Sequence, residues 1–430
     1  MCSNLGAMLR LLCALVLVGS VGATTGDRPT GTPPNIMLIT LDDVGIDRFP
    51  SYGVHPVPVR MPVMEQLIAG GVTFDRVWAM PSCSPTRASL LTGRFPSRHG
   101  IMNQIGPGDP TEPQLDPAEI TIPKVLPAYR SAVIGKWHLR SAGNPTTHPL
   151  ACGFTHHLGS MYNVGANGYF HWRRYVDGTF AIENRYATTV TTTDALRLTQ
   201  ILPQPWFLFV NYNAAHAPFH VPPPHLHTYG SPSDEITQFR AMLEAMDTEI
   251  GRMLAGVDLD TTLVIVLGDN GTPRPVTDGP WSPDHAKGSL YEGGVRVPMV
   301  VHGPGVGQGR SDALISVVDV HRTLVEWVGG NFQAQDSISF VPQLLDPSTP
   351  GSRQYLFSEK SNDQAGGATG PGHQRAISDG RWKLISDNFG QQFFDLSVDL
   401  VEVNNLLQAP LSAEAQVAYD DLLQALATFP

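Results

Sequence analysis

Four oxygen-bearing side chains stand directly after two apolar runs of the chain. Asp42 and Asp43 follow the first run, and Asp269 and Asn270 follow the second. Carboxylate and amide oxygens bind hard cations such as Ca²⁺ or Mg²⁺, whereas zinc prefers histidine and cysteine. Either pair alone is equally consistent with a tight turn or a helix cap. Because both pairs lie at expected strand ends, together they favour a metal site.

A second feature that could do chemistry is Cys83, which opens a short segment of helical spacing. Pro85 suits the first turn of such a helix, so Cys83 would lie at its N-terminus. There, backbone N–H groups and the helix dipole stabilise negative charge. Arg87 lies one turn later on the same face, where it would brace the side chain at position 83 or the carboxylates of the metal site. The alternatives are a buried structural cysteine and a simple reactive thiol.

Further polar side chains follow two other apolar runs. Lys136 and His138 come just after residues 131–134, and His216 comes just after residues 206–212. In open α/β sheets, ligands bind outside the carboxyl ends of the strands. Polar groups from four strand ends would therefore meet in one crevice, and this convergence is a stronger signal than any single residue.

The segments that must position these residues alternate between two kinds of pattern. Short apolar runs, typical of buried parallel strands, occur at residues 36–41, 131–134, 206–212, 261–267 and 297–301. Segments of helical period lie between them, at residues 61–69, 86–91, 193–202 and 236–254. Strands that alternate with helices predict an α/β fold with a doubly wound sheet.

The N-terminus has the pattern of an export signal. Arg10 precedes an apolar run, residues 11–18, that is too short to span a bilayer, and Val-Gly-Ala at residues 21–23 fits a cleavage site. An uncleaved anchor is the alternative. We predict a signal peptide over residues 1–23, no stable membrane insertion after its removal, and a periplasmic or secreted protein.

The pattern changes again near residues 343–352. Beyond a loop rich in glycine and polar residues, 361–373, three short strand-like runs precede an amphipathic segment at residues 412–426. These features predict a small C-terminal α+β subdomain with an antiparallel sheet and a helix. The expected division is thus a main α/β domain at residues 30–345 and a C-terminal subdomain at residues 346–430.

Bulk composition excludes some classes of protein. The chain has 430 residues, 42% of them hydrophobic, which is enough for a large core. Its formal net charge of -11 argues against a general nucleic-acid binder. Outside the predicted leader only Cys83 and Cys152 remain, so the chain is no disulfide scaffold. A bridge between these two cysteines is allowed by count alone. Scarce disulfides and glycosylation sequons favour a bacterial periplasm over a eukaryotic secretory route.

Residues 83–94 read Cys-Ser-Pro-Thr-Arg-Ala-Ser-Leu-Leu-Thr-Gly-Arg. This segment resembles the signature of the sulfatase family, Cys-x-Pro-Ser/Thr-Arg followed by Leu-Thr-Gly-Arg. Other segments resemble further sulfatase blocks in the same order: Gly-Lys-Trp-His-Leu at residues 135–139, Leu-Gly-Asp-Asn-Gly at 267–271, and Lys287 with Glu-Gly-Gly-Val-Arg-Val-Pro at 292–298. The likeness extends from about residue 35 to residue 407. Arg140 departs from the pattern, since glycine is usual after Leu139.

The resemblance implies a formylglycine-dependent, type I, arylsulfatase-like enzyme with an alkaline-phosphatase-like fold. Such a fold has a large mixed, mostly parallel sheet flanked by helices. A formylglycine-generating enzyme would oxidise Cys83 during maturation, and the hydrate of formylglycine would attack the sulfur of a sulfate ester. Sulfate would then leave as the aldehyde re-forms. The implied ligands of one Ca²⁺ are Asp42, Asp43, Asp269, Asn270 and the modified Cys83, with Asp269 also a candidate base.

The matching blocks also imply roles for the remaining polar residues. His138 would take a proton from the second hydroxyl of the hydrate, while His216 and Lys287 would bind sulfate and protonate the leaving oxygen. Lys136, Lys287 and Arg87 are fixed cations that would stabilise the charge of the transition state. Taken singly, these lysines and histidines are better explained as surface or core residues; within matching blocks, the functional interpretation is favoured.

The predicted reaction is therefore hydrolysis of sulfate monoesters, of an aryl or a carbohydrate alcohol. One alternative is a phosphonate monoester or phosphodiester hydrolase of the same superfamily, against which Lys136 paired with His138 favours sulfate. Another is a non-catalytic protein that binds sulfated glycans, which should have lost the nucleophile or a metal ligand. Substrate-contacting loops are expected at residues 163–174, 220–229 and 361–373, and Asn163 falls near a small polar substrate contact of some relatives.

Overall fold

The computed structural model describes residues 24–27, 31–108, 110–165, 168–361 and 372–430. The predicted signal peptide and most of the predicted loop at residues 361–373 lie outside the described residues. Within the described ranges, no helix combines the length and the apolar character that a bilayer-spanning segment requires.

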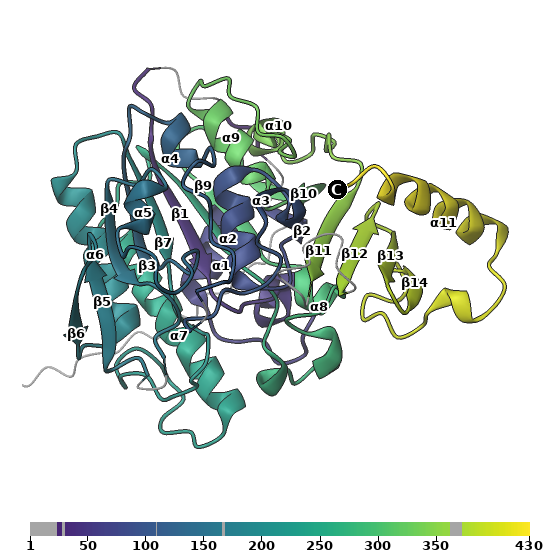
Figure 1. Ribbon diagram of the computed structural model, residues 1–430, viewed down its shortest axis with the longest axis horizontal. Coiled ribbons are helices and arrows are strands. Elements are labelled where there is room, and N and C mark those ends of the chain that lie inside the picture. Colours follow the sequence, from purple (N-terminus) through teal and green to yellow (C-terminus); the bar gives the residue numbers. More distant parts are fainter. Residues whose placement is uncertain (1–23, 28–30, 109, 166–167, 362–371) are drawn as a thin grey trace, which may run out of the picture.

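A sheet of ten strands forms the centre of the molecule (Figure 1). Its inner strands are parallel, because β1 pairs with β7 and β8 and β3 pairs with β7 and β4. Antiparallel pairs lie towards both edges, so the sheet is mixed, as the resemblance implies. In spatial order the strands are β10 (Gly309–Ser316), β2 (Val72–Trp78), β9 (Met299–His302), β8 (Thr262–Gly268), β1 (Asn35–Leu41), β7 (Trp206–Asn211), β3 (Arg130–Lys136), β4 (His156–Ser160), β5 (Trp172–Val176) and β6 (Thr179–Glu183).

Helices cover both faces of this sheet, because its inner strands are apolar on both sides. Alternate residues of a strand point to opposite faces. Accordingly, Ile36 and Leu38 of β1 belong to one core with α2 and α9, while Met37 and Ile39 belong to another with α1, α6 and α7. With both faces buried, the ends of the strands are left to carry polar groups.

The longer helices are α1 (Pro62–Gly70), α2 (Cys83–Thr92), α6 (Ala187–Ile201), α7 (Glu235–Leu254), α9 (Asp319–Trp327) and α11 (Ala413–Leu426). Short helices are α3 (Pro96–His99), α4 (Ile122–Val125), α5 (His148–Ala151), α8 (Glu292–Val295) and α10 (Val341–Leu345). The 3-10 turns are η1 (Ile46–Arg48), η2 (Pro50–Tyr52), η3 (Arg274–Val276), η4 (Pro283–His285) and η6 (Leu406–Gln408).

The structure corrects the prediction at β9. The apolar run at residues 297–301 predicts a parallel strand, but β9 pairs antiparallel with both β8 and β2. The chain between β8 and β9 does not cross a face of the sheet. It returns to the end of β8 that it left, where the Gly268 N–H donates to the Pro298 carbonyl at 3.1 Å. Without a crossover, the next strand must run in the opposite direction.

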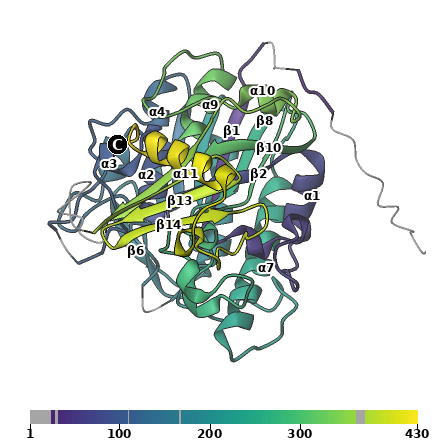
Figure 2. The ribbon, with the colours of Figure 1, turned by 90° about the vertical axis from the view of Figure 1, so that its right-hand side faces the viewer.

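A separate antiparallel sheet of four strands follows the main sheet, as the C-terminal pattern predicts. Its strands are β11 (Leu356–Ser361), β12 (His373–Ser378), β13 (Trp382–Asp387) and β14 (Gly390–Asp395). Figure 2 shows this sheet with α11 lying against it. Ser358 of β11 donates to the Ala79 carbonyl just after β2 at 3.1 Å, which joins the two sheets.

Candidate active site

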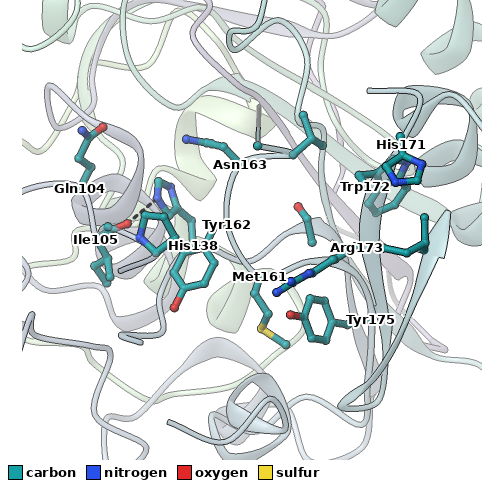
Figure 3. Close-up of a pocket in the computed structure, with 16 residues that line it drawn as sticks. Gln104, Ile105, His138, Met161, Tyr162, Asn163, His171, Trp172, Arg173 and Tyr175 are labelled. Atoms are coloured by element: carbon teal, nitrogen blue, oxygen red, sulfur yellow. Dashed lines mark hydrogen bonds between the residues drawn. The ribbon is translucent and has the colours of Figure 1, made fainter. Parts of the chain in front are cut away.

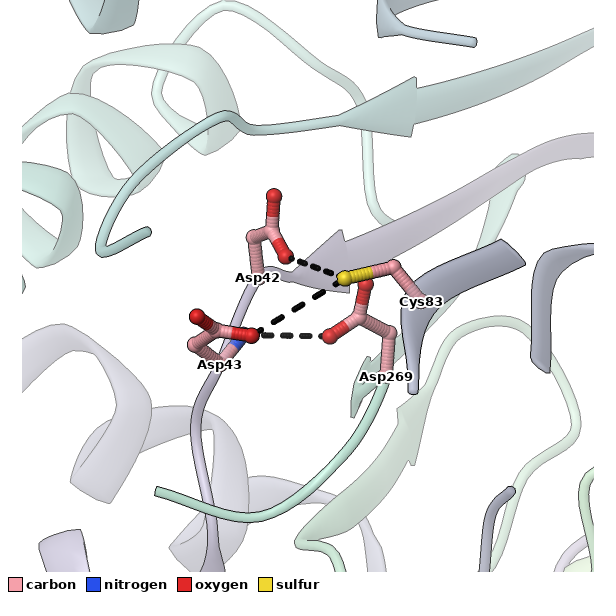
Figure 4. A group of neighbouring side chains, drawn as sticks. All are labelled: Asp42, Asp43, Cys83 and Asp269. Atoms are coloured by element: carbon pink, nitrogen blue, oxygen red, sulfur yellow. Dashed lines mark hydrogen bonds between the residues drawn. The ribbon is translucent and has the colours of Figure 1, made fainter. Parts of the chain in front are cut away.

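The carboxyl ends of β1 and β8 and the start of α2 meet at one point (Figure 4). Asp42 and Asp43 follow β1, Asp269 follows β8, and Cys83 is the first residue of α2. One ligand atom from each of these four buried side chains lies within 4.8 Å of the others. Two of the four predicted strand ends therefore converge here, and the four side chains lie close enough together to hold a metal ion.

Cys83 is held inside this cluster by the helix that it begins. Its Sγ donates to Oδ1 of Asp42 at 3.2 Å and lies 3.9 Å from Oδ1 of Asp43. Burial, together with the charges of Asp269 and Asp42, raises the pKa of the Cys83 thiol well above its ordinary value. Reactive cysteines lie in electropositive surroundings that stabilise a thiolate. The unmodified thiol is thus poorly suited to nucleophilic attack. Cys83 and Cys152 are both free, so no disulfide joins them.

Asn270 supplies the clearest sign that a cation belongs here. Its Nδ2 donates to Oδ1 of Asp43 at 2.8 Å and to the carbonyl of Gly271 at 3.0 Å. Its Oδ1 is buried and has no hydrogen-bond partner within the described part of the chain. A buried amide oxygen without a partner is costly, and a cation would satisfy it. Together with the three carboxylates, this oxygen makes a donor set suited to a hard cation.

Each carboxylate of the cluster has its own cationic neighbour. The ion pairs are Lys136–Asp42 at 2.6 Å, Arg87–Asp269 at 2.7 Å and Lys287–Asp43. Arg87 also donates to the carbonyl of Lys136 at 3.2 Å, so it braces the carboxylate cluster and the end of β3 together. Three positive formal charges cancel three negative ones. A bound divalent cation would therefore give the site the net positive charge that attracts an anionic ester.

Two aspartates of the cluster differ in their electrostatics. Burial disfavours the charged form of Asp43 and raises its pKa. The charges of Lys287, His216 and Lys136 have a larger opposing effect, so the pKa of Asp43 lies below the ordinary value. Burial and the charge of Asp42 raise the pKa of Asp269 to about 6, against the opposing effect of Arg87. Asp269 is consequently the more basic of the two carboxylates, which suits the predicted base.

His138 stands beside the start of α2. Its carbonyl accepts a hydrogen bond from Ser84 Oγ at 2.8 Å, and its Nε2 donates to the carbonyl of Ile105 at 2.9 Å. This contact leaves Nδ1 as the acceptor of a neutral ring, and Nδ1 is buried with no hydrogen-bond partner in the described ranges. Burial and the charges of Lys136 and Arg87 lower the pKa of His138 well below its ordinary value. The neutral ring can thus accept a proton through Nδ1.

His216 follows β7 and lies beside Asp43. Its Nε2 is 3.9 Å from Oδ2 of Asp43 and 3.3 Å from Nδ2 of Asn163, while Nδ1 donates to the Ala217 carbonyl at 2.8 Å. Burial lowers the pKa of His216 to about 4, although the charge of Asp43 opposes this shift. The structure therefore brings Asn163 and His216 together, as expected if both face the substrate.

A pocket of about 660 Å³ opens beside His138 (Figure 3). Its wall includes Asn163 and three aromatic side chains, Tyr162, Trp172 and Tyr175. The predicted loop at residues 163–174 supplies much of this wall, whereas residues 220–229 supply none of it. Such a wall suits a flat ring next to the reacting group.

The sequence patterns do not single out two cations close to this site. Arg274 and Lys360 line a second pocket that also contains Lys287. Neither lies in a motif, and they come from η3 and from β11 of the C-terminal sheet. Only the position of Arg274, shortly after the Asp269-Asn270 pair, offers a hint in the sequence.

Comparison with known proteins agrees with this geometry. Residues 34–330 match the family model described as Sulfatase. Mouse Arylsulfatase J is 26% identical over 413 residues, which cover 86% of this chain and 68% of the relative. Human N-acetylgalactosamine-6-sulfatase is 30% identical over 361 residues, which cover 73% of this chain and 66% of the relative. The chain thus spans about two thirds of the length of these two proteins.

Solved structures share the fold at low sequence identity. Ps i-CgsB in complex with k-i-k-neocarrahexaose superposes with a TM-score of 0.78 at 22% identity, over 92% of each chain. BT4656, solved with its substrate D-glucosamine-2-N,6-O-disulfate, superposes with a TM-score of 0.74 at 20% identity, over 92% of this chain and 97% of that one. Since the matching family model covers more than half of the 430 residues, this chain belongs to the sulfatase family, whose members hydrolyse sulfate esters.

Proposed function

We propose that this chain hydrolyses sulfate monoesters at a formylglycine made from Cys83, with one Ca²⁺ held by Asp42, Asp43, Asp269 and Asn270. The main observation behind the proposal is the position of Cys83 Sγ among three buried carboxylates, one of which, Asp43, is also held by Asn270, whose own Oδ1 has no partner in the described part of the chain. A thiol is a soft ligand and a poor match for a hard cation. An oxygen at the same position would match both the cation and the carboxylates.

The bound Ca²⁺ would neutralise the carboxylates and polarise the oxygens that face it. The hydrated aldehyde would supply one oxygen to attack sulfur and a second hydroxyl through which sulfate is expelled as the aldehyde re-forms. In this scheme the ester oxygen leaves as the alcohol, and no water attacks the sulfur.

The surrounding residues have separable roles in this proposal. Asp269, with its raised pKa, receives the proton of the attacking hydroxyl. His138 receives the proton of the second hydroxyl through the free Nδ1 of its neutral ring. Lys136 lies at the end of β3 against Asp42 and contributes fixed positive charge towards the sulfate oxygens. Arg87 is a positioning residue that holds Asp269.

Lys287 and His216 lie on the side from which the leaving oxygen would depart. The Nζ of Lys287 is 3.7 Å from Cys83 Sγ, so it would contact a sulfate bound there. Lys287 pairs with Oδ1 of Asp43, and His216 lies 3.9 Å from Oδ2 of the same carboxylate. Together they would bind the sulfate, and the ammonium of Lys287 would protonate the leaving oxygen, because the neutral ring of His216 donates its one N–H to the Ala217 carbonyl. Asn163 is a further polar contact on His216.

The proposed substrate is a carbohydrate sulfate or an aryl sulfate. The aromatic wall of the large pocket supports a ring next to the sulfate, because sugar and aryl rings both pack against aromatic faces. Of the solved structures with the same fold, one holds k-i-k-neocarrahexaose and another holds its substrate D-glucosamine-2-N,6-O-disulfate. The formylglycine-generating enzyme is the proposed maturation partner. We also propose that the protein is exported by a signal peptide at residues 1–23 and that it has no nucleic-acid partner. The proposed boundary between the main domain and the C-terminal subdomain lies near residue 345.

The test compares matured protein on the sulfate and the phenylphosphonate esters of 4-nitrophenol, which share a leaving group. We expect the larger kcat/KM for the sulfate ester and the complete loss of both activities in Cys83→Ala. A larger kcat/KM for the phosphonate ester would replace the proposal by phosphonate hydrolysis. Sulfated-sugar binding by wild type and Cys83→Ala, without turnover by either, would indicate a non-catalytic binding protein.

A further inference from the structure

A second pocket adjoins the reacting centre and has a different character. Its volume is about 330 Å³, and three cations line it, Arg274, Lys287 and Lys360, while no carboxylate does. Gln104 lines both this pocket and the large aromatic one. The two pockets therefore meet beside the reacting centre, and a substrate could extend into both.

The three cations differ in how far their charge is already balanced. Lys287 is paired with Asp43 and belongs to the reacting centre. Arg274 is 3.6 Å from Asp284, but both side chains are largely exposed, so this pair is weak. The Nζ of Lys360 donates to the carbonyl of Gly288 at 2.5 Å, and no ion pair joins it to a carboxylate among the described residues.

Lys360 and Arg274 also act on each other. Burial and the positive charge of Arg274 lower the pKa of Lys360, and the opposing influence of Asp387 is smaller. Two neighbouring cations on a partly buried pocket wall repel each other, so the binding of an anion between them is favourable. The feature stands out because the chain as a whole carries a net charge of -11.

The pocket is joined directly to the reacting centre through its own wall. The residue after Lys287 is Gly288, whose carbonyl holds Lys360, and Lys287 itself lies 3.7 Å from Cys83. Lys360 belongs to β11, so the C-terminal sheet contributes a side chain to the rim of the cleft. An anion bound by Lys360 and Arg274 would therefore lie close to the sulfate that is cleaved.

We propose that Arg274 and Lys360 form a subsite for a second anionic group, a sulfate or a carboxylate, carried by the same substrate as the scissile sulfate. This inference rests on the proposed sulfate hydrolysis and narrows its substrate class to polyanionic compounds. Because one molecule carries both anions, the second contact is made intramolecularly and adds affinity at little further entropic cost. The C-terminal sheet thus selects among sulfate esters.

The test uses simple probes that do not depend on the identity of the sugar. n-Alkyl monosulfates, α,ω-alkane bis-sulfates of graded length and ω-carboxyalkyl sulfates compete with 4-nitrophenyl sulfate in the matured enzyme. Calorimetry measures the same affinities independently of turnover. At the matching chain length, we expect the doubly anionic probe to bind at least about tenfold more tightly than the monosulfate, the factor expected for one additional charge-assisted hydrogen bond.

Variants assign this preference to the pocket. Lys360→Met and Arg274→Gln should each remove most of the preference for the second anion. The matched controls, Lys124→Met in α4 and Arg130→Gln at the start of β3, change exposed cations outside the pocket and should retain it. A preference for bis-sulfates identifies a second sulfate, and a preference for carboxyalkyl sulfates identifies a carboxylate.

Two results would overturn the subsite. The first is equal affinity, within about twofold, for singly and doubly charged probes at every length in wild type. The second is a preference that survives in both pocket variants. Failure of the proposed function would give a different result, because matured wild type would then not hydrolyse 4-nitrophenyl sulfate at all. Calorimetry would still show tighter binding of the doubly charged probe.

Discussion

The thiol of Cys83 donates a hydrogen bond to Oδ1 of Asp42 across 3.2 Å, between the first residue of α2 and the residue after β1. This contact places a cysteine in buried and acidic surroundings, and burial together with the charges of Asp269 and Asp42 raises its pKa rather than lowering it. A conventional thiolate nucleophile needs the opposite. The contact is instead what a metal site requires, because it puts the side chain at position 83 within reach of a cation held by Asp42 and its neighbours.

Adding Ca²⁺ to the metal-depleted protein should raise its thermal stability, and this effect should depend on Asn270 as a ligand. We expect added Ca²⁺ to raise the Tm of metal-depleted wild type, since a ligand at about a hundredfold excess over its Kd stabilises by about 2.7 kcal/mol. Asn270→Ala loses the unpartnered Oδ1 and should need at least about tenfold more Ca²⁺, the loss typical of disturbing even an outer contact of a metal site. Asn404→Ala, an exposed control, should respond like wild type. Equal Ca²⁺ responses of all three proteins would contradict the proposed ligand set.

Arg87→Lys should lower turnover although it retains the positive charge. Arg87 contacts Asp269 and the Lys136 carbonyl with two different nitrogens, and a lysine has only one. We expect kcat to fall by about a hundredfold, the effect of a small misplacement of a reacting group, with a smaller change in KM. Arg353→Lys is the control, because it weakens a buried Arg–Asp pair with Asp319 away from the site. It should lower Tm without lowering the kcat of the folded enzyme, and equal losses of kcat in the two variants would count against a positioning role for Arg87.

Arg140→Ala should weaken the binding of ring-bearing substrates. Its guanidinium donates to Tyr162 OH at 3.1 Å and lies 5.9 Å from the centre of that ring, which lines the large pocket. Loss of both contacts should raise KM for 4-nitrophenyl sulfate by about three- to tenfold and leave kcat within about twofold. Tyr162→Phe keeps the ring and should have a smaller effect. Methyl sulfate, which has no ring, should show no difference between wild type and Arg140→Ala.

The pH dependence of stability should reveal the buried ion-pair cluster that joins α8 to the C-terminal sheet. Lys383 pairs with Glu402 at 2.8 Å and with Glu292 at 3.0 Å. Burial raises the pKa of Glu402 from 4.5 to about 7, against Lys383 and with help from Glu292. Between these pH values the folded protein keeps a proton that the unfolded chain has lost. The resulting stabilisation is complete below pH 4.5 and is lost as the pH rises to about 7.

Glu402→Gln cannot ionise, so it should flatten this loss of stability. Thermal unfolding from pH 4.5 to pH 7 should show a decline in Tm that is smaller in Glu402→Gln than in wild type by roughly 2 °C or more. Glu414→Gln, an exposed glutamate of α11, is the control and should follow wild type. Parallel curves for all three proteins would show that Glu402 titrates normally.

The positions of the aspartates could be predicted because each follows a continuous apolar run. Asp42 and Asp269 come after runs that can only be strands buried on both faces, and the ends of such strands converge by topology. The helix that starts at Cys83 was equally readable from Pro85 and the spacing behind it. The local pattern and the packing agree at these residues, so the sequence alone is enough to predict where they lie in the fold.

Other elements could not be predicted because packing, not pattern, determines them. In β2, Asp75 and Arg76 interrupt the apolar pattern, since that strand lies second from the edge of the sheet and both residues are only partly buried. The direction of β9 depends on the return of the chain to Gly268, which no local pattern records. Lys360 and Arg274 are distant in sequence and meet only when the C-terminal sheet docks.

The most direct test of the account is the mass of the peptide that contains Cys83, measured in protein purified from a host that supplies the formylglycine-generating enzyme, alongside hydrolysis of 4-nitrophenyl sulfate. We expect active protein to show the mass change of a thiol converted to an aldehyde, and we expect activity to increase with the converted fraction. Protein that hydrolyses the ester while Cys83 remains an unmodified thiol would contradict it.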